Sequence, residues 1–226
     1  RRYRLRRPVD MAVDNTLILG HYFGEAPPTA GPGTVVFADP RDPLLGVHIL
    51  ADDYPALTRL ADANDTISGL DLAGAYIDRW HVRRIAAGVP EGPVDLVPER
   101  ALMLEAGLDQ LGAVDFDKGC YIGQEVTART HYRGLVKRRL VPIKVHISTP
   151  AVGSDIALDG RMIGTSRSSA PMTGLDGSEG SLCLGLLKLE DIHMIDSASC
   201  DSGAMTVGGL PAQLAIPSWM RPLPNA

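Results

Sequence analysis

The chain contains few cysteines, few aromatic residues and no apolar segment that could cross a membrane. Its three cysteines, Cys120, Cys183 and Cys200, are odd in number and show no C-x-x-C spacing. This excludes a disulfide framework and a self-sufficient zinc or iron–sulfur cradle, and it fits a reducing compartment best. Aromatic residues make up 5% of the 226 positions, so leucine, valine, isoleucine and alanine must supply most of the core. Because no apolar run approaches about 18 residues, we expect no membrane-spanning helix.

The chain is acidic overall but carries one strongly basic segment. Its formal net charge of −5 argues against a protein that coats nucleic acid. Between Lys118 and Arg139, however, six lysines and arginines stand against one acid, Glu125. One interpretation is a solvated helix face and a basic strand, which suits residues 137–139 taken alone. The other is a rim that binds anions.

The first half of the chain has the pattern of a sheet with helices beside it. Short apolar runs bounded by turn residues predict strands over residues 16–19, 34–37 and 46–50. Apolar residues at helical spacing over 73–80, with a Gly–Pro stop signal at 88–90, predict a helix. Arg83 and Arg84 lie near its carboxyl end, where the helix macrodipole favours cations. A second, short helix is predicted over residues 123–131, ended by Gly134.

The pattern changes near residue 135. Residues 139–147 begin as a partly alternating strand, and Asp159-Gly160 is typical of a tight hairpin. Further strands fit residues 181–187 and 206–216. Short strands at regular spacing favour a small β-barrel. We therefore predict an α+β protein of two domains, residues 1–134 and 135–226, with the hinge at Gly134.

Cys120 lies in the most informative segment, Lys118-Gly119-Cys120-Tyr121-Ile122-Gly123-Gln124-Glu125. A neighbouring ammonium group and a following helix amino terminus both favour the thiolate, which is the reactive form of cysteine. Three interpretations stay open. The thiol could be structural and inert, a nucleophile with His131 as base if the helix folds back, or a redox-active or transiently metal-ligating group. The flanking glycines favour a functional thiol, whereas Cys183 and Cys200 are interpreted as structural.

This segment resembles the K-G-C-Y-x-G-Q-E signature of YgfZ-type folate-binding proteins, relatives of the glycine cleavage T-protein. The similarity extends upstream through residues 88–90 and 104–108 and downstream through residues 126–139. The resemblance implies a T-protein-like folate-binding domain followed by a Greek-key-type β-barrel. It also implies that part of the first domain precedes a strand over residues 3–9. The cofactor it implies is tetrahydrofolate or a related folate.

The same resemblance implies the site residues. Glu105, in a Leu104-Glu105-Ala106-Gly107 pattern like that of the T-proteins, would accept hydrogen bonds from a pterin 2-amino group and ring N–H. From sequence alone, a surface glutamate that caps a turn is an equal alternative. Cys120 is the functional thiol, and the further cofactor-binding candidates are Lys118, Tyr121, Gln124, Glu125 and Arg129. Arg129 could pair with Glu125 or face a ligand carboxylate, and Gln124 and Glu125 could instead brace the Cys120 loop. The scattered histidines predict no permanent metal site.

The resemblance implies a tetrahydrofolate-binding accessory factor in the assembly or repair of iron–sulfur proteins, affecting tRNA modification only indirectly through cluster enzymes. Its partners would be iron–sulfur client or assembly proteins, and it would act in the bacterial cytoplasm or, in a eukaryote, the mitochondrial matrix. One alternative is a folate-dependent aminomethyl- or methyltransferase, which would not require the thiol signature. Another is a non-enzymatic RNA-binding module, motivated by the basic residues 118–139 and ranked last because aromatic residues are few.

Overall fold

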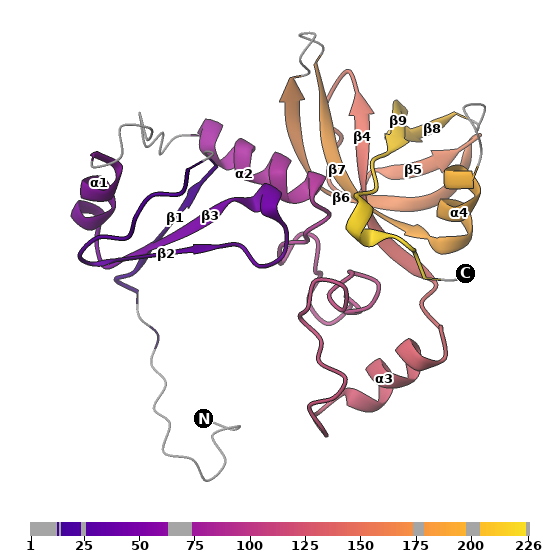
Figure 1. Ribbon diagram of the computed structural model, residues 1–226. Coiled ribbons are helices and arrows are strands. Elements are labelled where there is room, and N and C mark those ends of the chain that lie inside the picture. The colour runs from indigo at the N-terminus through magenta and orange to yellow at the C-terminus, as the bar shows by residue number, and fades with distance from the viewer. Residues whose placement is uncertain are drawn as a thin grey trace. The chain divides into compact units, whose positions relative to one another are not determined.

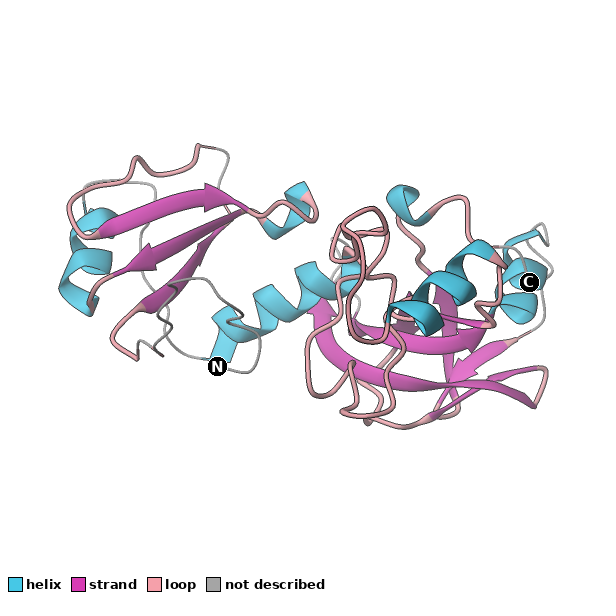
Figure 2. Cartoon of the chain, turned by 90° about the horizontal axis from the view of Figure 1, so that it is seen from below, coloured by secondary structure: helices cyan, strands magenta, loops and turns pink. Residues whose placement is uncertain are grey.

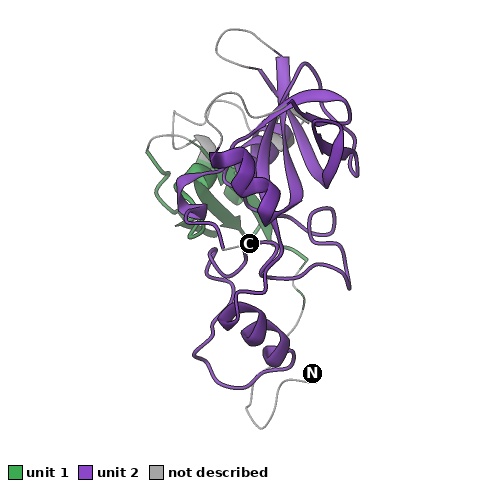
Figure 3. Ribbon diagram, turned by 90° about the vertical axis from the view of Figure 1, so that its right-hand side faces the viewer, with its two compact units in different colours: residues 1–71 green, residues 72–226 purple. Residues whose placement is uncertain are grey.

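The computed structural model describes residues 13, 15–23, 26–62, 74–173, 179–197 and 204–224 (Figure 1). The strand predicted over residues 3–9 lies outside them. The chain forms two compact units, residues 1–71 and 72–226 (Figure 3). The segment before the barrel, up to Gly134, thus divides between the two units. The assignment of residues 1–134 to one T-protein-like domain stays a prediction.

The first unit is a three-stranded antiparallel sheet with a helix on one face. The strands lie in the order β1 (Ile18–Tyr22), β3 (Val47–Ala51) and β2 (Thr34–Ala38), close to the three predicted runs. A short 3-10 helix, η1 (Pro43–Leu45), precedes β3. Helix α1 (Tyr54–Asp62) was not predicted, and it places Leu57 in one cluster with Ile49 of β3. The Asp53 carboxylate accepts a hydrogen bond from the Ala56 N–H at 2.7 Å, which caps the amino terminus of α1.

On the opposite face of this sheet, an ionised aspartate accepts hydrogen bonds from neighbouring side chains. Burial disfavours the charged form of Asp39, but hydrogen bonds from Arg41 and His48 outweigh it and hold the pKa of Asp39 well below its usual range. The Asp39 Oδ2 atom lies 2.6 Å from His48 Nε2. Burial, together with the nearby His48 ring, lowers the pKa of His21 to about 4. His21 is therefore neutral at physiological pH, and Asp39, held by Arg41 and His48, is ionised.

The second unit contains the predicted β-barrel, whose strands curve around a common core (Figure 2). Its order is β4-β7-β6-β5-β8-β9, and β4 closes the barrel by pairing with both β7 and β9. The consecutive strands β5, β6 and β7 return to lie beside β4, as in a Greek key. The strands are β4 (Arg138–His146), β5 (Asp155–Leu158), β6 (Arg161–Thr173), β7 (Glu179–Lys188), β8 (Met205–Val207) and β9 (Leu210–Leu214). Helix α4 (Leu189–Ser197) follows β7, and η2 (Ser218–Met220) follows β9.

The inner and outer faces of the barrel wall follow from the alternation of side chains along each strand. Val141, Ile143 and Val145 of β4 share the inner cluster with Cys183 of β7. The interior is so tightly packed that a Cβ added at Gly185 would lie 2.4 Å from Ile143 Cδ1. Shape complementarity, as well as apolar character, therefore determines which residues this interior accepts.

Helix α2 (Gly74–Ala86) packs on the outside of the barrel, and its start agrees with the predicted helix. Its Ile85 joins a separate apolar cluster with Leu140 of β4, Ala170 of β6 and Leu184 of β7. The outer face of the barrel thus has its own small core, which holds the preceding segment against the wall. Within the described residues, no helix is long and apolar enough to span a membrane.

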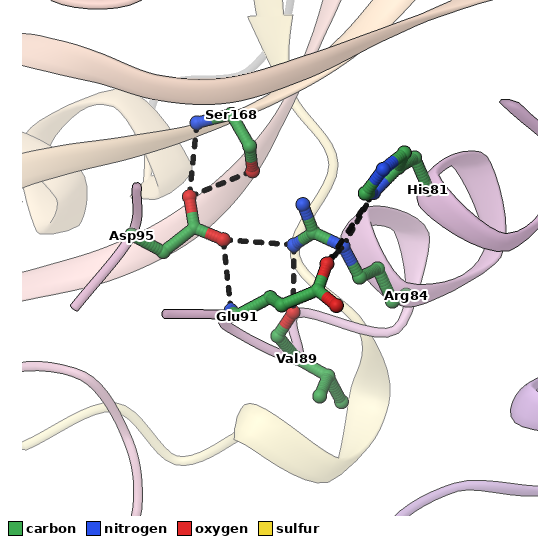
Figure 4. A network of polar contacts seen from close by, with 6 residues as sticks. All are labelled: His81, Arg84, Val89, Glu91, Asp95 and Ser168. Atoms are coloured by element: carbon green, nitrogen blue, oxygen red, sulfur yellow. Dashed lines mark hydrogen bonds and ion pairs between the residues drawn. The ribbon is translucent and has the colours of Figure 1, made fainter. Parts of the chain in front are cut away.

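A buried ion pair connects α2, the loop after it and strand β6 (Figure 4). Arg84 Nη1 donates to Asp95 Oδ2 at 2.8 Å, and both side chains are buried. Asp95 Oδ1 accepts from the N–H and the hydroxyl of Ser168, at 2.9 and 2.6 Å. Ser168 lies where the β6–β7 register shifts between Ser166 and Ser169, so the bulge leaves its N–H without a ladder partner. The carboxylate supplies that partner.

We expect an Asp95→Ala variant to lose about 3–5 kcal/mol of unfolding free energy, because it breaks a buried ion pair, leaves Arg84 only the half-exposed Glu91 carboxylate and leaves the Ser168 N–H without an acceptor. Both tryptophans, Trp80 and Trp219, lie in the second unit, so urea unfolding followed by tryptophan fluorescence reports on this unit. The control is Asp196→Ala, which breaks a solvent-exposed pair with Arg221 and should cost at most about 1 kcal/mol. Equal losses in the two variants would contradict the role given to Asp95.

Candidate functional site

The Leu104-Glu105-Ala106-Gly107 segment forms a turn that points two neighbouring side chains in different directions. Leu104 belongs to the barrel's inner core cluster. Glu105 is nine-tenths buried, and its backbone carbonyl accepts the Leu140 N–H of β4 at 2.8 Å. The turn therefore lies against the first barrel strand. Leu104 packs in the core, and the next residue, Glu105, belongs to a polar site.

Arg139 of β4 holds this turn in place through hydrogen bonds. Its guanidinium donates to the Leu104 carbonyl at 2.6 Å and to the Gln110 side-chain carbonyl. Gly107 has φ of 77°, and a Cβ there would lie 3.1 Å from Arg139 Nη2. Glycine is needed at this position for its backbone conformation, and a side chain would also crowd the arginine.

The prediction of residues 137–139 as a solvated basic strand is wrong for Arg139, which is fully buried. Burial lowers the pKa of Arg139, while the nearby Asp109 carboxylate acts to raise it. The sequence contained the signal for this position. Strand alternation places Arg139 on the same face as Val141, Ile143 and Val145, the residues that fill the barrel.

Glu105 lines a cavity of about 330 Å³ between residues 95–106 and the outer wall of the barrel. Arg138 Nε donates to Glu105 Oε1 at 3.1 Å, and the Glu105 side chain is only 12% exposed. Leu140 and Leu186 supply apolar wall, whereas Arg100 and Arg167 bring further positive charge. The alternative of an exposed, turn-capping glutamate is therefore excluded, and a ligand in this cavity would meet a carboxylate.

Cys120 is exposed, as a functional thiol requires, but it is not among the residues that line the Glu105 cavity. The two main candidate residues, Glu105 and Cys120, therefore do not line one cavity. Gly119 and Gly123, on either side, have φ of 85° and 89° in open surroundings. They are needed for backbone conformation alone, since a Cβ would meet nothing within 4 Å at either position. The thiol lies on a tight, solvent-facing turn that leads into α3.

Short-range contacts hold the Cys120 turn. Lys118 Nζ lies 4.8 Å from the centroid of the Tyr121 ring, a cation–π contact. The Tyr121 N–H donates to the Gln124 side-chain carbonyl at 3.3 Å, so Gln124 braces the turn as one interpretation expected. Two of the predicted ligand-binding residues thus contact the neighbour of the thiol directly.

Helix α3 (Gln124–Tyr132) forms where predicted, and its backbone leaves the helix near Gly134, which has φ of 60°. Glu125 and Arg129 are both exposed, and no ion pair joins them among the described contacts. His131 stacks on Phe116 with ring centroids 4.0 Å apart. In the described part of the chain Cys120 has no hydrogen-bonded base, so the arrangement gives no support to a Cys–His nucleophile.

The remaining cysteines differ from Cys120. Cys183 is fully buried in the barrel core, and burial raises the pKa of its thiol to about 12, which makes it inert. Cys200 lies outside the described residues. No group of three or more His, Cys, Asp or Glu side chains among the described residues is arranged to hold a metal ion. Chemistry at Cys120 must therefore start from one accessible thiol.

The barrel is similar to a known family of domains. Residues 137–222 match the family of CAF17 C-terminal β-barrel domains, which covers the barrel strands from β4 to β9.

Over longer stretches the chain is a relative of iron–sulfur cluster assembly factors. It is 35% identical to the mitochondrial iron–sulfur cluster assembly factor IBA57 of Mus musculus over 160 residues, which cover 70% of this chain and 41% of the relative. It is 33% identical to IBA57 of Homo sapiens over 191 residues, 76% of this chain and 50% of the relative. The IBA57 homolog of Coccidioides immitis is 27% identical over 223 residues, 83% of this chain and 51% of the relative. The chain thus spans about half the length of the relatives it matches.

A Gly107→Ala variant should be markedly less stable than Gly112→Ala. Both residues have positive φ, 77° and 72°, so both alanines cost about 1–2 kcal/mol of conformational energy. Only Gly107 faces Arg139, and crowding there should cost about 1–3 kcal/mol more. Urea unfolding followed by tryptophan fluorescence gives both values. Similar losses in the two variants would show that Arg139 does not depend on this glycine.

Proposed function

We propose that this chain takes part in the assembly or repair of iron–sulfur proteins and that Cys120 is its functional thiol. The observation that carries the proposal is one exposed cysteine on a glycine-flanked basic turn, in a relative of proteins named iron–sulfur cluster assembly factors. These relatives are mitochondrial by name, so in a eukaryote we place the activity in the mitochondrion.

The chemistry of the turn suits a transferred cluster as substrate. Iron–sulfur clusters are bound by cysteine thiolates, and a thiol loses its proton when it binds iron. Lys118, two residues before Cys120, and the amino terminus of α3, which begins at Gln124, both favour a bound anion. Since the described residues offer one exposed thiol and no three-ligand cluster, the other ligands would come from a partner protein. Such a role requires exposure, which Cys120 has.

Tetrahydrofolate belongs to the same proposal, bound at the Glu105 cavity. A carboxylate there can accept two hydrogen bonds from the 2-amino group and adjacent ring N–H of a pterin. A cavity of about 330 Å³ lies at the lower end of the range for small-molecule sites. Arg138 holds one oxygen of Glu105 and so fixes the plane of the carboxylate.

A Cys120→Ser variant should lose the function without losing the fold. In cells lacking their own IBA57, the complete protein should restore the activity of iron–sulfur enzymes, whereas the variant should restore less than about a tenth of it. An enzyme without a cluster serves as the internal control, and Cys183→Ser tests whether any cysteine change is harmful. Full rescue by Cys120→Ser would remove the thiol from the mechanism.

Tetrahydrofolate should bind the complete protein and bind a Glu105→Gln variant about 10- to 100-fold more weakly. The amide replaces a charged acceptor of two hydrogen bonds, each worth about 1.5 kcal/mol or more when charge-assisted. Fluorescence titration measures both affinities, and Glu190→Gln, at an exposed glutamate of α4 outside the cavity, is the matched control. Unchanged affinity in Glu105→Gln would move the pterin out of this cavity.

A further inference from the structure

The Glu105 cavity contains more positive charge than its acids neutralise. Three arginines and two acids line it: Arg100, Arg138, Arg167, Asp95 and Glu105. Asp95 is already paired with Arg84, which does not line the cavity, and Glu105 is paired with Arg138. Among the described contacts, neither Arg100 nor Arg167 has a carboxylate within ion-pair distance. Two positive charges therefore remain for a ligand.

The fold of the barrel determines where Arg167 lies. Arg167 lies in the β6 segment where the register with β7 shifts, and β-bulges commonly redirect a side chain toward a site. The bulge is held by the buried Asp95, which bonds to the backbone and hydroxyl of Ser168, the next residue. The Arg167 Nη1 atom donates to Thr165 Oγ1 at 3.1 Å and to the Ser166 carbonyl at 3.3 Å. These neutral acceptors orient the guanidinium and leave its charge uncompensated.

The loop after α2 also contributes to the site. Arg100 comes from this loop and lines the cavity together with Arg167. Apolar surface lies between the charges, contributed by Leu140 and Leu186 of the barrel and by Val97 and Ala106 of the loop. Arginine binds planar oxyanions through paired N–H groups, and apolar wall favours a flat organic body. The lining matches a molecule with an apolar body and two negative charges.

We propose that this cavity binds a small organic dianion through Arg100 and Arg167. The shared ligand chemistry is two negative charges on an apolar or aromatic body, supplied either by two carboxylates or by one phosphate ester. The site does not require Cys120. It shares the cavity with the proposed pterin site but uses different residues, since the pterin site rests on Glu105, which is paired with Arg138.

Two probes without a pterin ring test the site by isothermal titration calorimetry at about 50 mM salt, where charge interactions are weakly screened. p-Aminobenzoylglutamate represents the dicarboxylates, and phenyl phosphate represents the phosphate esters. We expect at least one to bind. Arg100→Gln and Arg167→Gln should each weaken it about tenfold, because each removes a charge-assisted contact. The tighter probe identifies the source of the dianion.

Controls separate this site from the pterin site and from loss of fold. Arg133→Gln removes an exposed arginine at the end of α3, outside the cavity, and should leave the affinity unchanged. Glu105→Gln should not weaken either probe, because it removes a negative charge from the cavity, although it should weaken tetrahydrofolate. Thermal unfolding confirms that each variant is folded. Absence of binding by both probes, or affinities unchanged in the Arg100→Gln, Arg167→Gln double variant, would overturn the proposal.

Discussion

The ion pair between Arg84 and Asp95 is the contact on which the second unit depends. One carboxylate receives hydrogen bonds from Arg84, from the Glu91 N–H and from both polar groups of Ser168. A carboxylate has about four acceptor positions, so Asp95 is fully used. An apolar replacement of the pair could fill the volume, but it could not satisfy the Ser168 N–H that the bulge leaves open. This is why charged residues are needed where buried ion pairs alone give little net stability.

At another place on the barrel, Arg139 likewise supplies a hydrogen bond that a backbone group would otherwise lack. The turn at residues 104–110 has carbonyl groups that receive no hydrogen bond from a strand or helix. For the Leu104 carbonyl, the buried guanidinium of Arg139 donates that hydrogen bond. Its aliphatic stem lies on the inner face of β4 with the core residues, while its head reaches the turn. The Gln110 amide in turn donates to the Met220 carbonyl at 3.4 Å. The loop before the barrel and the segment after its last strand are thereby joined through one arginine-centred group of contacts.

Much of the architecture could be predicted because it rests on local patterns. The Asp159-Gly160 hairpin, the strands of the barrel, and the glycine-ended helix α3 all follow from turn chemistry and periodicity. Helix α1 was missed although Asp53 and Pro55 provide the cap and the first-turn proline typical of a helix start. Arg84 was interpreted only through the helix macrodipole, because its partner Asp95 and the Ser168 bulge are brought to it by folding. Contacts between such distant positions have no local signal.

The Glu105 cavity and the Cys120 turn differ in the same way: the cavity depends on contacts between distant positions, and the turn depends on local sequence. Glu105 was placed in a site by its motif, but the arginines around it come from a loop and from two positions on the barrel wall that no motif groups together. Cys120 could be predicted as exposed because its flanking glycines and the following helix define the turn without help from the rest of the fold.

This difference also indicates what each feature can bind. The cavity walls are fixed through buried Asp95 and through Arg138, so the cavity can select a small molecule by shape and charge. Among the described contacts, the Cys120 turn is held by its neighbours Lys118, Tyr121 and Gln124, and Cys120 does not line the Glu105 cavity. A thiol so placed gains selectivity only when another surface covers it, because one exposed side chain cannot discriminate between ligands. The proposed small molecule and the proposed protein partner would therefore meet this chain at different places.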